Sequence, residues 1–422
     1  MGQRILYLTQ WFDPEPMMKG IGFVRALQDQ GYSVEVLTGF PNYPTGTLAP
    51  GYKLSLYKLE VLEGVRVHRV FLYPSHDHSS FGRALNFLSF FLSTLVFCLF
   101  NAHRYDAIYV FHPPITVGLS AALSGFVTRR PFLLDIQDLW PDSVGASGMN
   151  GTRGMARILG PICDFVHRRA ALVIGQSKAM TECLIERGVE RIRTATIFNW
   201  ADEDAARPRG IYDVSRLEFD GHFNFVFGGN LGRVQGLETL VHAAKRAALE
   251  VPEIQLTLIG DGVERERLAN LITEISADNV KLRAAVPRNQ IGDVFAAADV
   301  LVLHLTNDPL FEITVPSKTQ FYMAMGKPIL IGVSGEAARI VTSAEAGLAT
   351  LPENIEAMAD AMVQLARTSP SELARMGAGG RAVYERDFSF ASAIQATVAA
   401  LEAVLHARKP RQPSPTSGPR ST

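Results

Sequence analysis

The stretch Phe225–Ala244, FVFGGNLGRVQGLETLVHAA, decides the fold because it joins an apolar strand to a helix through a glycine loop. The apolar run ends at Gly228 and Gly229, and a helical pattern begins near Gln235. Glycines at such a junction let backbone N–H groups approach a phosphate, and a helix N-terminus favours an anion. The stretch therefore predicts a phosphate-binding loop in the middle of the chain.

The second half of the chain alternates strands with helices on both sides of this loop. Apolar strand patterns occupy residues 223–229, 254–260, 280–286, 299–305 and 327–333, and helical patterns occupy residues 237–250 and 263–275. Alternation of this kind predicts a parallel, doubly wound sheet. The ligand of such a sheet lies at the carboxyl ends of its strands.

The first half has the same plan. Strands are predicted at residues 4–12, 33–38, 65–72, 106–112, 131–136 and 171–177, and a crossover helix follows Gly22 and ends at Gly31. Two such sheets predict two Rossmann-like domains. We place the domains at residues 1–204 and 205–385, a C-terminal helix packing back toward the N-terminal domain at 386–407, and a disordered tail at 408–422.

Composition narrows the class of protein. The 422 residues are too many for one ordinary core, which also predicts two domains. The 41 basic and 42 acidic side chains give a net charge of −1, so the chain lacks the overall positive charge that is typical of a nucleic-acid-binding protein. Three scattered cysteines lack metal-ligand spacing, which predicts a reducing compartment without structural disulfides or zinc.

Residues 84–102, ALNFLSFFLSTLVFCLFNA, contain no charged side chain. A membrane-spanning helix here would divide one sheet between two sides of a bilayer. Two interpretations of the segment remain: a buried core helix, or a helix that lies in the membrane interface from one side. The lack of a polar face favours the second, and Arg83, His103 and Arg104 beside the segment suit anionic headgroups.

Two further motifs suit a diphosphate. Gly260 and Gly262 form a second glycine loop after a strand, and a helix begins at Pro316 with Ser317 and Lys318 in its first turn. A hydroxyl, a lysine and free amides at a helix N-terminus favour a diphosphate. An ordinary N-terminal cap is the alternative interpretation of Ser317.

Together these segments resemble the retaining glycosyltransferases of family 4, whose GT-B fold has two Rossmann-like α/β domains with parallel sheets facing across a cleft. The similarity is carried by IFNWAD, GGNLGRVQGLETLV, IGDGVERERL, AVPRNQIGDVFAAADVLVL, VPSKTQFYMAMGKPIL and the closing helix. Residues 133–143, LLDIQDLWPDS, and 315–318, VPSK, resemble the branch that builds bacterial O-antigen, capsule and colanic acid, including L-fucose and N-acetyl-L-fucosamine transferases.

The resemblance implies that the second domain holds a nucleotide-sugar donor. The amides around Gly229 and Asn230 would bind the diphosphate, with Ser317 and Lys318 opposite. Many family members have Arg and Lys where this chain has Asn230 and Gln235. Arg233 is the nearest residue that could supply the missing positive charge, and the alternative interpretation is that Arg233 is a solvated charge on the loop. The usual ribose-binding glutamate falls on Phe321 in this chain, and the nearby polar candidates are Gln320 and Glu312.

In the first domain, the resemblance implies that Asp138 binds or orients a donor-sugar hydroxyl. Asp135 either does the same or caps the next turn. His112 ends a strand and points toward the cleft or is structural. The loop with Gly20 and Gly22 would close over the diphosphate because glycine permits close approach.

The implied reaction is front-face displacement with retention, resting on positioning and on stabilising the leaving diphosphate. Asp202-Glu203-Asp204 matches a metal-binding pattern of another transferase fold but lies at the interdomain connection, so no metal or separate cofactor is predicted. The predicted acceptor is a polyprenyl-diphosphate-linked saccharide at the cytoplasmic face of the bacterial inner membrane, and UDP is the predicted nucleotide. A sugar-nucleotide epimerase, an NAD-dependent dehydrogenase and a non-catalytic membrane-bound partner are the alternatives.

Overall fold

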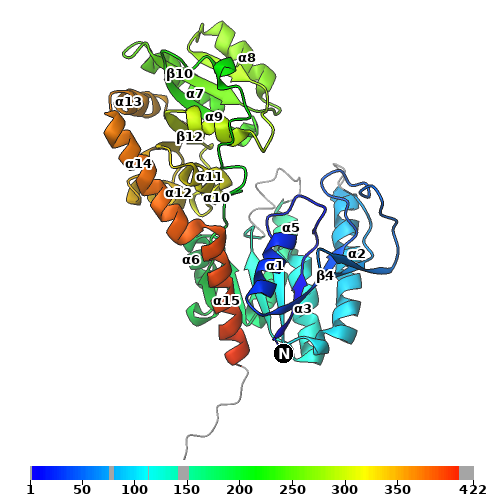
Figure 1. Cartoon of the computed structure of the whole chain (residues 1–422). Helices are drawn as coiled ribbons and strands as arrows, with labels where there is room; N and C mark the ends of the chain where they lie inside the picture. The colour runs from blue at the N-terminus through cyan, green and yellow to red at the C-terminus, as the bar shows by residue number, and fades with distance from the viewer. Residues whose placement is uncertain (1, 76–79, 113, 141–151, 408–422) are drawn as a thin grey trace, which may run out of the picture. The chain divides into compact units, whose positions relative to one another are not determined.

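The computed structural model describes residues 2–75, 80–112, 114–140 and 152–407. The chain forms two compact units (Figure 1). The first unit contains residues 1–175, 184–195 and the chain from Ile394 onward, and the second contains residues 176–183 and 196–393. Each unit is built on a largely parallel sheet, as predicted. The predicted tail, 408–422, lies outside the described residues.

The first sheet has the order β3-β4-β2-β1-β5-β6-β7-β8. Neighbouring strands from β4 to β7 pair in parallel, whereas β3 pairs with β4 in the antiparallel direction. The strands are β1 (Arg4–Leu8), β2 (Ser33–Gly39), β3 (Tyr57–Leu62), β4 (Val65–Val70), β5 (Ala107–His112), β6 (Phe132–Ile136), β7 (Leu172–Gly175) and β8 (Thr194–Thr196). Every residue of β5 and β6 is buried, as expected for strands covered on both faces.

Four helices of the described chain connect strands of the first sheet as crossovers, namely α1 (Ile21–Asp29), α2 (Ser80–Asn101), α3 (Ile115–Thr128) and α5 (Thr152–Arg169). The 3-10 turn η1 (Ala102–Arg104) follows α2, α6 (Lys178–Glu186) follows β7, and α15 (Phe390–His406) is the last described helix. Helices α2 and α3 pack side by side (Figure 1). From Ile394 onward α15 belongs to this unit, where Thr397 shares a hydrogen bond with Tyr109.

The second sheet has the order β11-β10-β9-β12-β13-β14, and all its pairs are parallel. The strands are β9 (Phe223–Gly228), β10 (Ile254–Ile259), β11 (Val280–Arg283), β12 (Val300–His304), β13 (Ile329–Gly332) and β14 (Gly347–Thr350). The chain proceeds outward from β9 to β11 and then returns to β12 on the other side of β9. Open sheets bind ligands at such a reversal, outside the carboxyl ends of the strands.

The helices of the second unit cover this sheet. They are α7 (Leu237–Ala247), α8 (Arg265–Glu274), α9 (Ile291–Ala297), α10 (Pro309–Glu312), α11 (Ser317–Met325), α12 (Glu336–Ser343), α13 (Ile355–Ala366) and α14 (Pro370–Val383), with turns η2 (Arg191–Arg193), η3 (Val214–Leu217), η4 (Arg233–Gln235) and η5 (Tyr384–Phe388) elsewhere in the chain. Side chains of β9 and β10 pack with α7 and α13 in one core cluster. A second cluster on the other side of the sheet includes Phe295 and Tyr322.

Helix α2 covers the predicted apolar segment 84–102 and exposes an apolar face. Phe90, Thr94 and Cys98 are fully buried against the unit. Leu92 and Val96 lie on the opposite face with 52% and 56% of their surface exposed. The helix is therefore not a core helix buried on all sides. By length and composition, Phe81–Arg104 and Pro370–His406 are the helices of the described chain that could cross a membrane.

Candidate functional site

Two glycine loops pack backbone against backbone at the carboxyl ends of β9 and β10. Gly229 has φ +135° and Gly260 has φ +152°, both in the region that favours glycine. The Gly229 N–H donates to the Ile259 carbonyl at 2.9 Å. A Cβ on Gly260 would lie 1.8 Å from the Gly229 carbonyl oxygen, and one on Gly262 would lie 2.5 Å from that of Leu231. Side chains are therefore excluded, and the two loops form one backbone surface.

Replacing Gly260 with Ala is expected to lower the free energy of unfolding by at least about 1–3 kcal/mol, because the residue combines positive φ with a backbone clash. Gly22→Ala is the matched control. Gly22 lies on an exposed helical face, and a Cβ there meets nothing within 4 Å. Alanine should therefore leave stability unchanged or raise it by up to about 1 kcal/mol. Urea denaturation compares the two variants, and equal stabilities would contradict the close packing of the loops.

Lys318 lies beneath these loops at the start of α11. Its Nζ donates to Gln235 Oε1 at 3.0 Å and lies 4.6 Å from the centre of the Phe227 ring. The end of its side chain also fills the space beside Gly229, since a Cβ there would lie 2.7 Å from Lys318 Cε. Burial lowers the pKa of Lys318 to about 8. Among the described residues, no carboxylate pairs with this ammonium group, so the site holds a half-buried cation that an anion would stabilise.

His304 fixes the loop that contains Gln235, and it was not among the predicted site residues. This buried histidine ends β12, where a polar residue after an apolar run was the available signal. Its Nε2 accepts the Glu353 N–H at 3.0 Å, so the proton is on Nδ1, which donates to the Gln235 carbonyl at 2.8 Å. Burial lowers the pKa of His304, in keeping with this neutral form. His304 therefore positions the partner of Lys318.

The other predicted residues of α11 and its loop occupy different environments. Pro316, not Ser317, is the N-cap of α11, and Ser317 is its first residue. Ser317 is exposed and makes no capping bond, so the alternative interpretation as a cap is wrong. Gln320 is buried, whereas Glu312 is exposed. Phe321 packs at an angle against Phe295, with ring centres 5.7 Å apart.

Asn230 and Arg233 lie on the outer side of the first glycine loop. Asn230 is exposed, and its Oδ1 would lie 2.6 Å from a Cβ at Gly262. The Arg233 side chain is 85% exposed, with Nε 3.4 Å from Glu264 Oε1. Arg233 and Glu264 line a cavity of about 450 Å³ with Arg267. Lys318 is held by its hydrogen bond to Gln235 and by the Phe227 ring, whereas Arg233 is held by its ion pair with Glu264.

The carboxylates of 202–204 are used within the second unit. Asp202 pairs with Arg288, and Asp204 lies 2.5 Å from Arg209. Glu203 accepts the Tyr384 hydroxyl proton at 2.9 Å and the Phe390 N–H at 2.9 Å. This segment therefore ties together parts of the second unit.

A buried ion pair in the first unit corrects both interpretations of Asp135. Lys19 Nζ pairs with Asp135, and both side chains are fully buried. The Tyr109 hydroxyl donates to Asp135 at 2.6 Å, and the Tyr7 hydroxyl donates to the Lys19 carbonyl at 2.8 Å. Asp135 is thus neither a turn cap nor exposed to a sugar. It anchors the loop that precedes α1.

The predicted loop of Gly20 and Gly22 is divided by the start of α1. Gly20 is the N-cap, and a Cβ there would lie 2.4 Å from Asp13 Oδ2. The Asp13 carboxylate accepts the Ile21 N–H at 2.6 Å. Gly22 is a helical residue, so its placement in the loop was wrong.

Asp138 and His112 lie at the carboxyl edge of the first sheet, as predicted. Asp138 is exposed shortly after β6, and residues 141–151 beyond it lie outside the described chain. His112 ends β5, and its ring packs edge-to-face against Trp140 at 5.9 Å. Burial lowers the pKa of His112 to about 3. Neither ring nitrogen has a hydrogen-bond partner within the described chain.

Comparisons with known proteins match both units. Residues 22–200 match the family described as glycosyl transferase 4-like domain, and residues 222–368 match glycosyl transferases group 1. The glycosyltransferase WbjE of Pseudomonas aeruginosa is 24% identical over 295 residues, covering 68% of this chain and 72% of that protein. The colanic acid biosynthesis glycosyl transferase WcaI of Escherichia coli K12 is 26% identical over 287 residues, covering 63% and 68%.

Solved structures show the same fold. HepE of Anabaena in complex with UDP-glucose superposes with a TM-score of 0.66 at 19% identity, covering 95% of this chain and 99% of that one. Sucrose-phosphate synthase from Thermosynechococcus elongatus superposes with a TM-score of 0.70 at 19% identity, covering 96% and 100%. Because the two family matches together account for most of the chain, it belongs to the group 1 glycosyltransferases and has the GT-B fold.

Proposed function

We propose that this glycosyltransferase takes its sugar from a nucleotide-sugar donor whose diphosphate binds the glycine loops and Lys318 of the second unit. The observation that carries the proposal is the half-buried Lys318 ammonium group, which lies beside the Gly229 loop and whose partners among the described residues are an amide and an aromatic ring. HepE, whose structure contains UDP-glucose, has the same fold and supports this donor class.

The chemistry follows from where negative charge develops. When the sugar leaves, the nucleotide diphosphate gains negative charge. Lys318, the backbone surface of the two loops and the N-terminus of α11 are fixed before the reaction begins, so they stabilise this charge without rearranging. We propose front-face displacement with retention, in which the departing phosphate assists removal of the acceptor proton. Asp138 orients a donor-sugar hydroxyl in this proposal.

The acceptor that we propose is a polyprenyl-diphosphate-linked saccharide used in making a bacterial surface polysaccharide. The name of WcaI, a colanic acid biosynthesis enzyme, supports this class. The exposed apolar face of α2 supports peripheral contact with a membrane, which we place at the cytoplasmic face of the bacterial inner membrane. We propose a UDP-linked donor, with an N-acetyl-fucosamine-type sugar as the first candidate.

The test uses the full chain in detergent with radiolabelled UDP-sugars and a polyprenyl-diphosphate-linked saccharide. We expect label to enter the lipid fraction, and UDP to be released, only when both substrates are present. NMR of the product then reads the anomeric configuration, and inversion would contradict the proposed displacement. Conversion of the donor without an acceptor would favour an epimerase, and nucleotide binding without transfer to any acceptor would favour a non-catalytic partner.

A further inference from the structure

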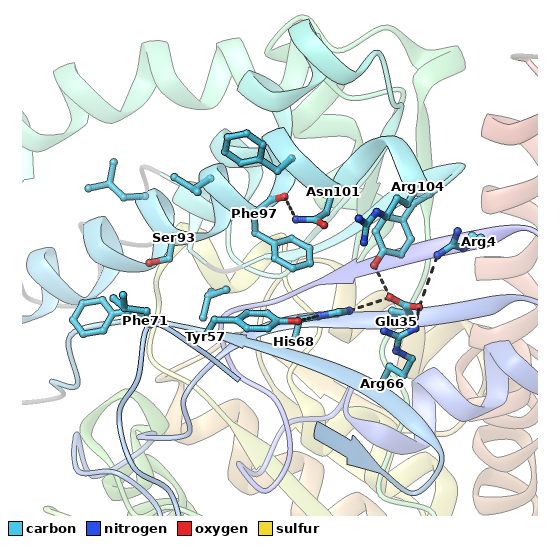
Figure 2. Close-up of a pocket in the computed structure, with 16 residues that line it drawn as sticks. Arg4, Glu35, Tyr57, Arg66, His68, Phe71, Ser93, Phe97, Asn101 and Arg104 are labelled. Carbon is cyan, nitrogen blue, oxygen red and sulfur yellow. Dashed lines mark hydrogen bonds and ion pairs between the residues drawn. The ribbon is translucent and has the colours of Figure 1, made fainter. Parts of the chain in front are cut away.

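A large groove runs along the exposed face of α2 in the first unit. It lies between α2 and the β3–β4 hairpin and has a volume of about 710 Å³ (Figure 2). Its walls are mainly apolar and aromatic, formed by Leu56, Tyr57, Leu92, Val96, Phe97 and Phe100. Leu56 is 83% exposed and Phe100 is 71% exposed. The groove is therefore an open channel for an apolar chain rather than part of the core.

One end of this groove is basic. Figure 2 shows Arg4, Arg66 and Arg104 gathered near Glu35 at that end, with Phe71 and Ser93 at the other. Arg66 Nη1 lies 3.3 Å from Glu35 Oε1, and Arg4 Nη2 lies 3.9 Å from the same oxygen. Arg4 and Arg66 thus share the Glu35 carboxylate, and Arg104 adds a third positive charge to the same end of the groove.

Glu35 is already occupied by other donors. Its Oε2 accepts the Tyr105 hydroxyl proton at 2.6 Å and lies 2.9 Å from His68 Nε2. Arg104 is exposed and has no carboxylate partner within the described chain. The basic end therefore keeps net positive charge toward solvent, as expected for a site that receives an anion.

The basic end lies at the edge of the sheet opposite the predicted sugar site. Arg4 begins β1, Arg66 is the second residue of β4, and Arg104 ends the turn η1, three residues before β5 begins at Ala107. These strands are parallel within the sheet, so all three arginines lie at its amino edge. His112, at the other end of the six-residue β5, is about 16 Å away along the strand at about 3.3 Å per residue. An anion held by the arginines is therefore remote from the proposed reaction.

We propose that this groove binds one anionic membrane phospholipid. Its phosphate would lie among Arg66, Arg104 and Arg4, and an acyl chain would lie along Leu92 and Val96. Guanidinium groups bind phosphate through paired hydrogen bonds, and burial of the chain and of the exposed apolar wall adds hydrophobic stabilisation. An acidic peptide would leave the apolar wall uncovered. The inference rests on the proposed membrane contact and does not depend on sugar transfer.

The experiment measures flotation of the full chain with vesicles of phosphatidylcholine alone or with added phosphatidylglycerol, followed by native mass spectrometry of the retained lipid. We expect preference for the anionic vesicles and retention of one phosphatidylglycerol. Arg66→Gln/Arg104→Gln should weaken this binding by about thirtyfold, because each charge near a membrane surface contributes about fivefold. Leu92→Ser/Val96→Ser should weaken binding to both vesicles.

The matched control is Arg25→Gln/Arg168→Gln, which removes the same charge from exposed positions of the same unit. Arg104→Gln alone disturbs no carboxylate pair of the described chain, so weaker vesicle binding by this variant could not be explained by misfolding. Equal losses in the groove variant and the control would overturn the proposal, as would equal binding to both vesicles. A dimer in the mass spectrum that Leu92→Ser/Val96→Ser abolishes would assign the groove to a second copy and would also overturn it.

Sugar transfer in detergent separates this inference from the proposed function. A groove variant that keeps transfer but loses vesicle binding would support both. Wild-type protein that binds anionic vesicles but transfers no sugar would contradict the proposed function alone. Normal transfer with vesicle binding that the arginine substitutions leave unchanged would contradict the lipid site alone.

Discussion

Lys19→Met is expected to lower the free energy of unfolding of the first unit by about 3–5 kcal/mol, because it leaves the buried Asp135 carboxylate without its cation. Lys19 also carries the carbonyl that accepts the Tyr7 hydroxyl proton, directly before the N-cap Gly20. Loss of the ion pair would therefore loosen the loop at the start of α1 as well. Chemical denaturation followed by circular dichroism measures the change.

Two variants control this result. Lys58 pairs with Glu60 at 2.7 Å but is 44% exposed, so Lys58→Met should cost no more than about 1 kcal/mol. Lys19→Met/Asp135→Leu removes both charges and should recover much of the stability that Lys19→Met loses. Equal costs for Lys19→Met and Lys58→Met would show that the buried pair does not organise the unit.

Lys318→Met is expected to lower turnover by about 10²–10³-fold, because it removes a preorganised positive charge from the leaving diphosphate. It should leave the stability of the ligand-free protein unchanged or higher, since the half-buried ammonium group has a lowered pKa and pairs with no carboxylate of the described chain. A structural lysine would show the opposite pattern, with loss of stability accompanying loss of activity. Steady-state kinetics and urea denaturation of the same variant separate the two roles.

The pH dependence of nucleotide binding gives a second readout of Lys318. In the ligand-free protein its pKa is about 8, so the ammonium group is charged below that pH and neutral above it. Affinity for a nucleotide diphosphate should therefore fall as the pH rises through about 8 in the wild type. Lys318→Met should bind weakly without this decline, and an identical decline in the variant would assign the titration to another group.

The central strands could be predicted because each is a continuous apolar run bounded by polar or turn residues. The short or exposed strands could not. Residues of β3 are exposed or half-buried, and β14 has no fully buried residue, so neither shows the pattern of a core strand. No strand was predicted at β8, a three-residue segment that is half-buried and lies at the edge of the first sheet. These strands form because the backbone N–H and C=O groups of a neighbouring strand are available for hydrogen bonding.

The glycine loops and Lys318 could be found because their signals are local, a strand followed by glycine and a lysine in the first turn of a helix. Contacts between distant residues were not visible. Lys19 and Asp135 are 116 residues apart, and His304 and Gln235 are 69 apart. Asp135 was therefore predicted as a sugar ligand, although its carboxylate pairs with the buried Lys19. For the same reason no role was predicted for His304.

Hydrogen–deuterium exchange of the full chain with UDP, GDP or uridine tests the donor site most directly. We predict that the nucleotide diphosphate that binds slows exchange in peptides covering residues 228–236, 259–264 and 316–320, and that uridine does not. Lys318→Met should lose this protection at the same ligand concentration. Nucleotide binding that protects other peptides and leaves these three segments unchanged would contradict the account.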